Sequence, residues 1–294
     1  MLEFHNVSFR YPGGPVIIPG LSFKIEKGEF VALAGSNGAG KSTISRLSNG
    51  LLLPTAGEVT VGGFNTKATR ASQIARKAGF LFQNPDRQIC QNTTREEIAF
   101  GMRVQGLPEE EVAARTEEAL KTFGLDGDRS PFTRSRGERQ RIALASVLVG
   151  KPELVILDEP TTGLDYKECT AIMEHIAKLN REEGLTILMV CHDMELIQSY
   201  AERVLVLNGG TLLGDGPTRS IMKDRDLLAA AMRGPAPVPP PALRLGKGGG
   251  DVFSVRGVAG EEPRPVNRPL ALDFVRRRLE QAGRFGCTGQ EKRD

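Results

Sequence analysis

The sequence predicts an α/β protein with a parallel sheet at its centre, on three observations. Short apolar runs at 30–34, 154–157 and 185–190 are typical of strands that are buried on both faces. Helical patterns separate these runs, and such alternation of strands and helices favours a parallel sheet. A glycine-rich loop follows the first run directly and leads into an expected helix at 42–53. We therefore expect one large α/β domain.

The N-terminal segment predicts a smaller antiparallel β subdomain beside this core. Apolar and polar residues alternate there, first at Leu2 and Phe4 and later at Leu21, Phe23 and Ile25. This period of two, with Gly-Pro turns between the segments, is typical of strands with one buried face.

The middle of the chain predicts a helical subdomain at about 84–150, in which residues 93–124 have the clearest helical pattern. A further helix is expected at 167–182. The apolar run at 204–207 then enters an Asn-Gly-Gly turn, which is a hairpin signal.

The C-terminal segment differs in character, and we expect the folded domain to end near residue 234. Five of the seven residues at 235–241 are proline, which favours an extended spacer. We expect 235–294 to be a Pro/Gly-rich linker and a basic, mostly disordered tail. Two alternatives stay open: residues 272–282 have the spacing of a short basic helix, and residues 253–258 faintly echo the opening strand.

The composition excludes several classes of protein. Hydrophobic residues at 39% and charged residues at 26% are ordinary for a globular chain, and a net charge of +3 is too small to indicate nucleic-acid binding. No apolar stretch approaches the roughly 20 residues that cross a bilayer. The cysteines are scattered without paired spacing, which favours a reducing compartment. We expect a cytosolic protein that reaches a membrane only through a partner.

The loop at 35–42 fits the phosphate-binding pattern GxxxxGK[ST] at every fixed position. Glycines let backbone amides turn inward around phosphate oxygens, and the dipole of the following helix favours the same anion. Lys41 is expected to neutralise the β- and γ-phosphates, and the Ser42 hydroxyl to ligate Mg²⁺. The candidate ATP-binding residues of this segment are Gly35, Ser36, Asn37, Gly38, Ala39, Gly40, Lys41, Ser42 and Thr43. The loop alone does not separate a transporter motor from a small kinase or a GTPase.

Two carboxylates follow the apolar run at 154–157. Because ligands bind at the carboxyl ends of strands in open α/β sheets, Asp158 is placed to hold Mg²⁺. Glu159 is the candidate base that polarises a water for in-line attack on the γ-phosphate. The alternative is a solvated strand end, which four apolar residues running straight into Asp-Glu-Pro disfavour.

With these motifs, the sequence resembles the ABC ATPase family from about residue 2 to about residue 220, and so implies a P-loop NTPase core. By resemblance, Tyr11 stacks on adenine and Gln83 contacts Mg²⁺ or the attacking water. His192 corresponds to the switch histidine that reaches the γ-phosphate, and Asp165 occupies the D-loop at the dimer interface. Each residue alone has a structural alternative; their order and spacing together carry the resemblance.

One motif departs from the family. The pentapeptide LSGGQ of the family is here Arg-Ser-Arg-Gly-Glu at 134–138, which we call the signature segment. Ser135 and Gly137 survive, and their hydroxyl and amide are expected to donate to a γ-phosphate held by the opposing subunit. Arg136 either adds charge there or crowds the loop.

The resemblance implies a dimer in which each ATP lies between one subunit's P-loop and the other's signature. Both a homodimer and a heterodimer with another ABC ATPase subunit stay open; a heterodimer can pair this P-loop with a regular signature. Residues 82–88 resemble a stretch common in energy-coupling-factor importers and in cobalt and nickel importers, with further similarity at 54–59 and 192–196. That family implies integral membrane partners at the cytoplasmic face, and import of a vitamin or a transition-metal ion.

Two rival interpretations remain. A soluble ABC ATPase of repair, translation or chromosome work usually has two cassettes or a long coiled coil, and neither is evident here. A small-molecule P-loop kinase has no use for the series Gln83, Ser135 and His192.

Overall fold

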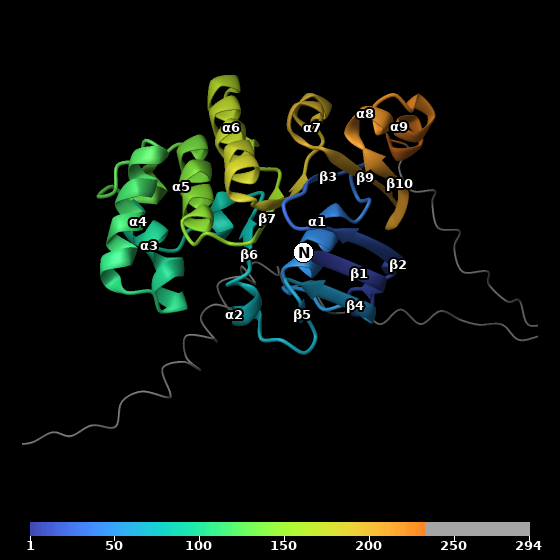
Figure 1. Ribbon diagram of the computed structural model, residues 1–294, viewed down its shortest axis with the longest axis horizontal. Helices are drawn as coiled ribbons and strands as arrows, with labels where there is room; N and C mark the ends of the chain where they lie inside the picture. Colours follow the sequence, from blue (N-terminus) through green and yellow to red (C-terminus); the bar gives the residue numbers. More distant parts are fainter. Residues whose placement is uncertain (233–294) are drawn as a thin grey trace, which may run out of the picture. The chain divides into compact units, whose positions relative to one another are not determined.

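The structure is a computed structural model that describes residues 1–232, which lie within one compact unit, Met1–Pro235 (Figure 1). The expected linker and tail at 235–294, with their two alternatives, lie outside the described residues.

A six-stranded sheet forms the centre of the molecule and confirms the predicted α/β class. Its strand order is β10-β9-β3-β8-β7-β6. All neighbouring pairs are parallel except β9 and β10, which form the expected hairpin. The strands are β3 (Phe30–Gly35), β6 (Ala78–Leu81), β7 (Leu154–Asp158), β8 (Thr186–Val190), β9 (Arg203–Asn208) and β10 (Thr211–Pro217). The loops after β3, β6, β7 and β8 therefore all leave from one edge of the sheet.

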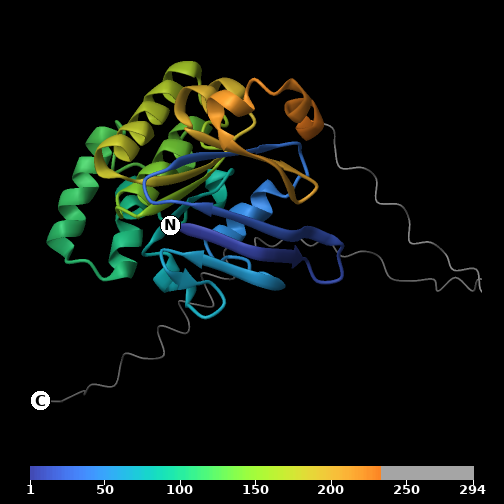
Figure 2. The same ribbon diagram turned by 45° about the vertical axis from the view of Figure 1, so that its right-hand side comes forward.

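Both faces of this sheet are covered, which explains why its strands are continuous apolar runs rather than alternating ones. On one face, Val31, Ile156 and Leu188 pack against the antiparallel sheet and α1 (Lys41–Ser48). On the other face, Ala32 and Leu157 pack against helices. Figure 2 shows the two covering layers on opposite sides of the central strands.

The antiparallel subdomain is a four-stranded sheet of order β2-β1-β4-β5, and it confirms the prediction from the N-terminal pattern. Its strands are β1 (Leu2–Arg10), β2 (Val16–Ile25), β4 (Ala56–Val61) and β5 (Phe64–Asn65). The alternating apolar side chains point into one shared core, where the rings of Phe4 and Phe23 stack with centroids 4.5 Å apart.

The prediction of a helix at 42–53 is wrong at the C-terminal end. Helix α1 stops at Ser48, with Asn49 as its C-cap, and Gly50 adopts φ +74°. A residue in this left-handed region ends a helix, so the apolar residues Leu51 and Leu53 follow in a loop and stay 40% and 50% exposed.

The helical subdomain is built from α3 (Thr94–Gln105), α4 (Glu109–Thr122) and α5 (Arg136–Leu148), at one end of the central sheet (Figure 1). These helices enclose their own small core around Ile98, Met102 and Val112. The short helices η1 (Pro85–Arg87) and η2 (Pro131–Thr133) connect it to the sheet and to α5.

The remaining helices are α2 (Ala71–Ile74), α6 (Tyr166–Glu183), α7 (Met194–Tyr200), α8 (Thr218–Ile221) and α9 (Arg225–Met232). Helix α6 packs on the central sheet through Ile172, Met173 and Ile176. Over residues 1–232, no helix combines the length and the apolar character that a membrane span requires.

Candidate functional site

The loop between β3 and α1 is held by backbone contacts on both sides. The Ala39 amide donates to the Ser36 carbonyl at 3.2 Å, and the Gly210 amide of the β9–β10 turn donates to the Ala39 carbonyl at 2.9 Å. Gly35 has φ +151°, and a Cβ atom there would lie 2.2 Å from the Leu207 carbonyl oxygen of the neighbouring strand. Only glycine therefore permits this close approach of loop and strand.

Lys41 lies inside this loop. Its Nζ donates to the carbonyl oxygens of Gly35 at 2.7 Å and Ser36 at 2.9 Å, and the residue is only 8% exposed. Burial lowers the pKa of the Lys41 ammonium, while the nearby carboxylates of Glu159 and Asp158 act in the opposite direction. The loop thus holds a positive charge at the N-terminus of α1, where the helix dipole also favours an anion.

Asp158 ends β7 and is 6% exposed. The Ser42 hydroxyl lies near its carboxylate, because the end of β7 is next to the first turn of α1. Burial raises the pKa of Asp158, and the neighbouring Glu159 raises it further, whereas Arg46, Ser42 and Lys41 lower it. The site therefore brings a hydroxyl oxygen and a carboxylate near each other at the N-terminus of α1.

Glu159 is the point at which three loops meet. Its Oε2 accepts hydrogen bonds from Gln83 Nε2 at 2.7 Å and from Thr162 Oγ1 at 3.2 Å. Its Oε1 lies 3.5 Å from His192 Nδ1. Gln83 follows β6, Glu159 follows β7 and His192 follows β8, so strand order alone brings these side chains to one place.

The backbone of Glu159 is unusual. It has φ +53°, and its amide donates to the Val190 carbonyl of the adjacent strand at 3.0 Å. A residue other than glycine in this region costs on the order of 1 kcal/mol or more, and such strain gathers at functional sites. The neighbouring strand fixes the strained turn, and the carboxylate side chain is thereby directed towards Gln83 and His192.

Two contributing residues are not among the predicted site residues. Thr162 donates to the Glu159 carboxylate, and the fully buried Gln140 on α5 donates to the Pro160 carbonyl at 3.2 Å. Gln140 thus ties the helical subdomain to the turn after β7. The sequence offers one signal for Gln140: it is a polar residue at a position that the helical pattern assigns to the core, and a buried polar group needs a hydrogen-bond partner.

Tyr11 follows β1 and lies outside this convergence. Its ring meets the Phe9 ring edge to face, with centroids 4.9 Å apart, and stays 38% exposed. The next strand, β2, touches the phosphate-binding loop, because a Cβ on Gly40 would lie 2.9 Å from Ile18 Cδ1. The β1–β2 hairpin therefore runs beside the loop with an exposed aromatic ring at its end.

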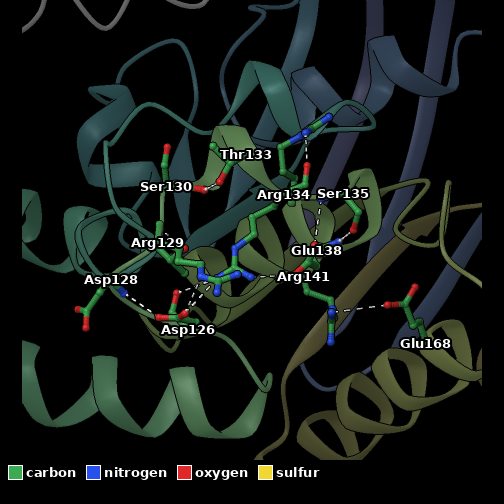
Figure 3. A network of polar contacts seen from close by, with 12 residues as sticks. Asp126, Asp128, Arg129, Ser130, Thr133, Arg134, Ser135, Glu138, Arg141 and Glu168 are labelled. Atoms are coloured by element: carbon green, nitrogen blue, oxygen red, sulfur yellow. Dashed lines mark hydrogen bonds and ion pairs between the residues drawn. The ribbon is translucent and has the colours of Figure 1, made fainter.

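Ser135 and Gly137 form a second cluster with Asp165, on the N-termini of α5 and α6. Figure 3 shows Ser135 with Glu138, and Glu168 on the neighbouring helix. Ser135 is the N-cap of α5 and forms a capping box with Glu138. Asp165 is the N-cap of α6 and forms a second capping box with Glu168. A Cβ on Gly137 would lie 3.0 Å from Glu168 Oε2, so the two helix starts are in direct contact.

Comparisons with known proteins agree with this geometry. The family model described as "ABC transporter" matches residues 18–162. The energy-coupling factor transporter ATP-binding protein EcfA of Methanothermobacter thermautotrophicus is 43% identical over 235 residues, which cover 79% of this chain and 75% of that protein. A putative ABC transporter ATP-binding protein of Caldanaerobacter subterraneus subsp. tengcongensis is 43% identical over 249 residues; this match covers 84% of the chain but only 44% of that longer protein.

Solved structures show the same fold. The chain superposes on cbiO1 of Clostridium perfringens, part of the ABC transporter complex cbiONQ, with a TM-score of 0.69 and 30% identity, covering 78% of this chain and 93% of that one. It superposes on the ATP-binding cassette MJ0796, a dimer bound to ADP and Pi, with a TM-score of 0.67 and 30% identity, covering 74% and 99%. The chain therefore belongs to the ABC transporter family, as one of its ATP-hydrolysing ATP-binding proteins.

Proposed function

We propose that this protein binds ATP with Mg²⁺ and hydrolyses it to power solute import through a membrane ABC transporter of the energy-coupling-factor type. The observation that carries the catalytic part is the convergence of Gln83 and His192 on Glu159, directly beside the phosphate-binding loop. The transporter type rests on the 43% identity to a protein named as an energy-coupling factor transporter ATP-binding protein.

In this proposal, backbone amides of residues 35–43 hold the triphosphate, and Lys41 neutralises its terminal phosphates. Tyr11 stacks on the adenine ring. Glu159 accepts the proton of the attacking water, which its strained turn and two side-chain neighbours orient. His192 is 68% exposed at its side chain and can turn from Glu159 towards a γ-phosphate.

The residues present fit a magnesium ion. Mg²⁺ prefers oxygen ligands and is usually held by one or two protein groups together with substrate phosphates. The Ser42 hydroxyl and the Asp158 carboxylate lie near each other at the end of β7, and the Gln83 amide bonds to Glu159, the residue that follows Asp158. When bound, the ion supplies neutralisation of phosphate charge; Ser42, Asp158 and Gln83 would hold it.

The second cluster completes the proposal. Ser135 and Gly137 face the nucleotide of a second subunit, and Asp165 lies at the same interface, so the protein works as a homodimer or as a heterodimer with another ABC ATPase subunit. Integral membrane subunits bind this dimer at the cytoplasmic face of the membrane. The imported solute is a vitamin or a transition-metal ion. No nucleic acid takes part.

The substitution Glu159→Gln tests the catalytic part, because it keeps the shape of the side chain and removes the base. We expect ATP hydrolysis to fall at least about a hundredfold while ATP binding persists and an ATP-bound dimer accumulates on size exclusion. Glu182→Gln, on the exposed face of α6, is the matched control. Hydrolysis by Glu159→Gln at the wild-type rate would show that another group is the base.

A membrane pull-down tests the transporter part against the soluble alternative in repair, translation or chromosome work. The full chain, captured from solubilised membranes, is expected to bring integral membrane proteins with it in stoichiometric amount. Recovery of the chain without any such protein favours the soluble alternative.

The domain boundaries are part of the same proposal: an ABC ATPase domain at 1–234, with its helical subdomain at about 84–150, followed by a linker and basic tail at 235–294. Removal of 235–294 is expected to leave ATP affinity within about twofold of the full chain, because each contact described above lies before residue 233. A large loss of affinity would place the tail within the fold.

A further inference from the structure

Two of the replaced positions in the signature segment, Arg134 and Glu138, contact each other. Arg134 Nη1 lies 3.0 Å from Glu138 Oε1, four residues further along the chain. Arg134 stands where the family pentapeptide has leucine, and Glu138 where it has glutamine. This chain thus has a charged pair, joined by a hydrogen bond, where the family pentapeptide has two neutral residues (Figure 3).

Glu138 uses both carboxylate oxygens. Oε2 accepts from the Ser135 amide at 3.0 Å, which is one half of the capping box, and Oε1 accepts from Arg134. In the other half, the Glu138 amide donates to Ser135 Oγ at 3.2 Å. The Ser135 amide and hydroxyl, then Arg134, lower the pKa of Glu138, so that it stays ionised at neutral pH.

Arg134 also reaches the loop after α4. Its Nη2 donates to the Asp126 carbonyl at 3.4 Å and lies 3.7 Å from Asp126 Oδ2, and its side chain is 13% exposed. The guanidinium therefore bridges the first turn of α5 and the end of the α4 segment. Through Glu138, this bridge fixes the N-cap at which Ser135 stands.

Neither family residue fits alone into this arrangement. A glutamine at 138 has one acceptor oxygen and one NH₂ group, so it would oppose a donor with a donor, either at Arg134 or at the Ser135 amide. It would also remove a negative charge from the first turn of α5, beside Arg134 and Arg136 at the positive end of the helix dipole, and would leave Asp126 as the acidic partner of Arg134. A leucine at 134 would leave Glu138 without its side-chain partner and cut the link to Asp126.

We propose that Arg134 and Glu138 are a matched pair of positioning residues that hold Ser135 and Gly137 in the geometry needed for the partner subunit's nucleotide. The altered signature is then a working one, in which two replacements compensate each other. This inference rests on the proposed function, since it needs the signature segment to face ATP in a dimer.

A double-mutant cycle in the full-length protein tests the pair: Arg134→Leu, Glu138→Gln and both together, the last restoring the family residues at both positions. Turnover, KM for ATP and ATP-dependent dimer formation are measured for each. We expect each single variant to lose at least about fivefold in turnover and dimer formation, and the double variant to recover to within about twofold of wild type. ATP affinity of the monomer, which depends on its own P-loop, should stay unchanged in all three.

Arg129→Leu is the matched control for Arg134, because Arg129 also pairs with Asp126 but has 70% side-chain exposure outside the signature segment. It is expected to behave as wild type. Additive losses in the double variant, or single variants with wild-type turnover, would overturn the inference. So would losses that follow a fall in melting temperature, because the pair would then be structural. If instead Glu159→Gln hydrolyses ATP normally, the proposed function fails before this cycle is considered.

Discussion

The phosphate-binding loop and the signature segment both lie at helix N-termini. They differ in which groups accept hydrogen bonds from the first amides of the helix. Helix α1, after the phosphate-binding loop, has Gly40 as its N-cap and no side chain that caps it. Helix α5 is capped by Ser135 in a full capping box. The first turn of a helix has amide groups without intrahelical partners, so the α1 end offers its amides to a ligand while the α5 end occupies some of its own.

This difference predicts which cluster tolerates substitution. Backbone groups and closely approached glycines shape the α1 site, and its Lys41 and Asp158 are almost fully buried. Side chains shape the α5 site, where Ser135 is exposed and Arg134 and Glu138 bond to each other. Two side chains can be replaced together if the new pair still bonds, whereas a backbone approach cannot be compensated by another residue. The unaltered P-loop and the altered signature follow this rule.

The largest expected effect is on ATP binding, through Lys41→Ala. The change removes the buried ammonium that two loop carbonyls hold at the phosphate site. Charge-assisted hydrogen bonds contribute about 1.5–3 kcal/mol each, so ATP affinity should fall at least about a hundredfold. Titration calorimetry measures this, with Lys178→Ala on exposed α6 as control. Unchanged affinity would remove the α1 cluster from nucleotide binding.

The next largest effect is on stability, through Gly35→Ala. The new methyl group would lie 2.2 Å from the Leu207 carbonyl oxygen, which belongs to a strand that cannot move aside. We expect a cost of several kcal/mol and a fall of about 10 °C in melting temperature, measured by calorimetry. A fall below about 3 °C would show that the loop and β9 separate easily.

The same substitution in the other cluster, Gly137→Ala, should be milder for stability. The nearest atoms are Glu168 Oε2 at 3.0 Å and Leu164 Cδ2 at 3.3 Å, which are ends of side chains, and alanine favours the helix. We expect the melting temperature to change by less than about 2 °C. ATP turnover should nevertheless fall several-fold, because displacing the Glu168 carboxylate disturbs the hydrogen bond that it accepts from the Asp165 amide. A loss of stability equal to that of Gly35→Ala would contradict the contrast between the two clusters.

The smallest effect concerns pH and the packing of α6 on the helical subdomain. The His175 ring meets the Phe123 ring at 5.1 Å, and burial, aided by Lys178, lowers the pKa of His175 below its usual 6.5. The folded state therefore binds fewer protons than the unfolded state, so this stabilisation is complete above pH 6.5 and is lost as the pH falls below that value. Between pH 7.5 and 5.5, the wild type should lose about 2 °C more in melting temperature than His175→Gln. Equal losses would show that His175 is as easily protonated when folded.

Local patterns determined much of this protein. The apolar runs at 30–34, 154–157 and 185–190 fixed buried strands, and the loop at 35–42 followed from glycine spacing, because these signals depend on neighbouring residues alone. The helix predicted at 42–53 extends beyond the end of α1 at Ser48. The apolar residues at 51 and 53 continue the helical spacing, but Gly50 adopts a left-handed conformation and ends the helix.

Only the tertiary structure decided how distant residues meet. Gln83 and Glu159 are 76 positions apart, and they come together because β6, β7 and β8 are neighbours in the sheet, an order that no local pattern encodes. Resemblance named Gln83 and Glu159, but it did not predict the hydrogen bonds of Thr162 and Gln140 to the turn after β7. The pairing of Arg134 with Glu138 depends on both local pattern and tertiary structure. The sequence shows that both residues depart from the family pattern. The fold shows that they touch, because four residues make about one turn of a helix start.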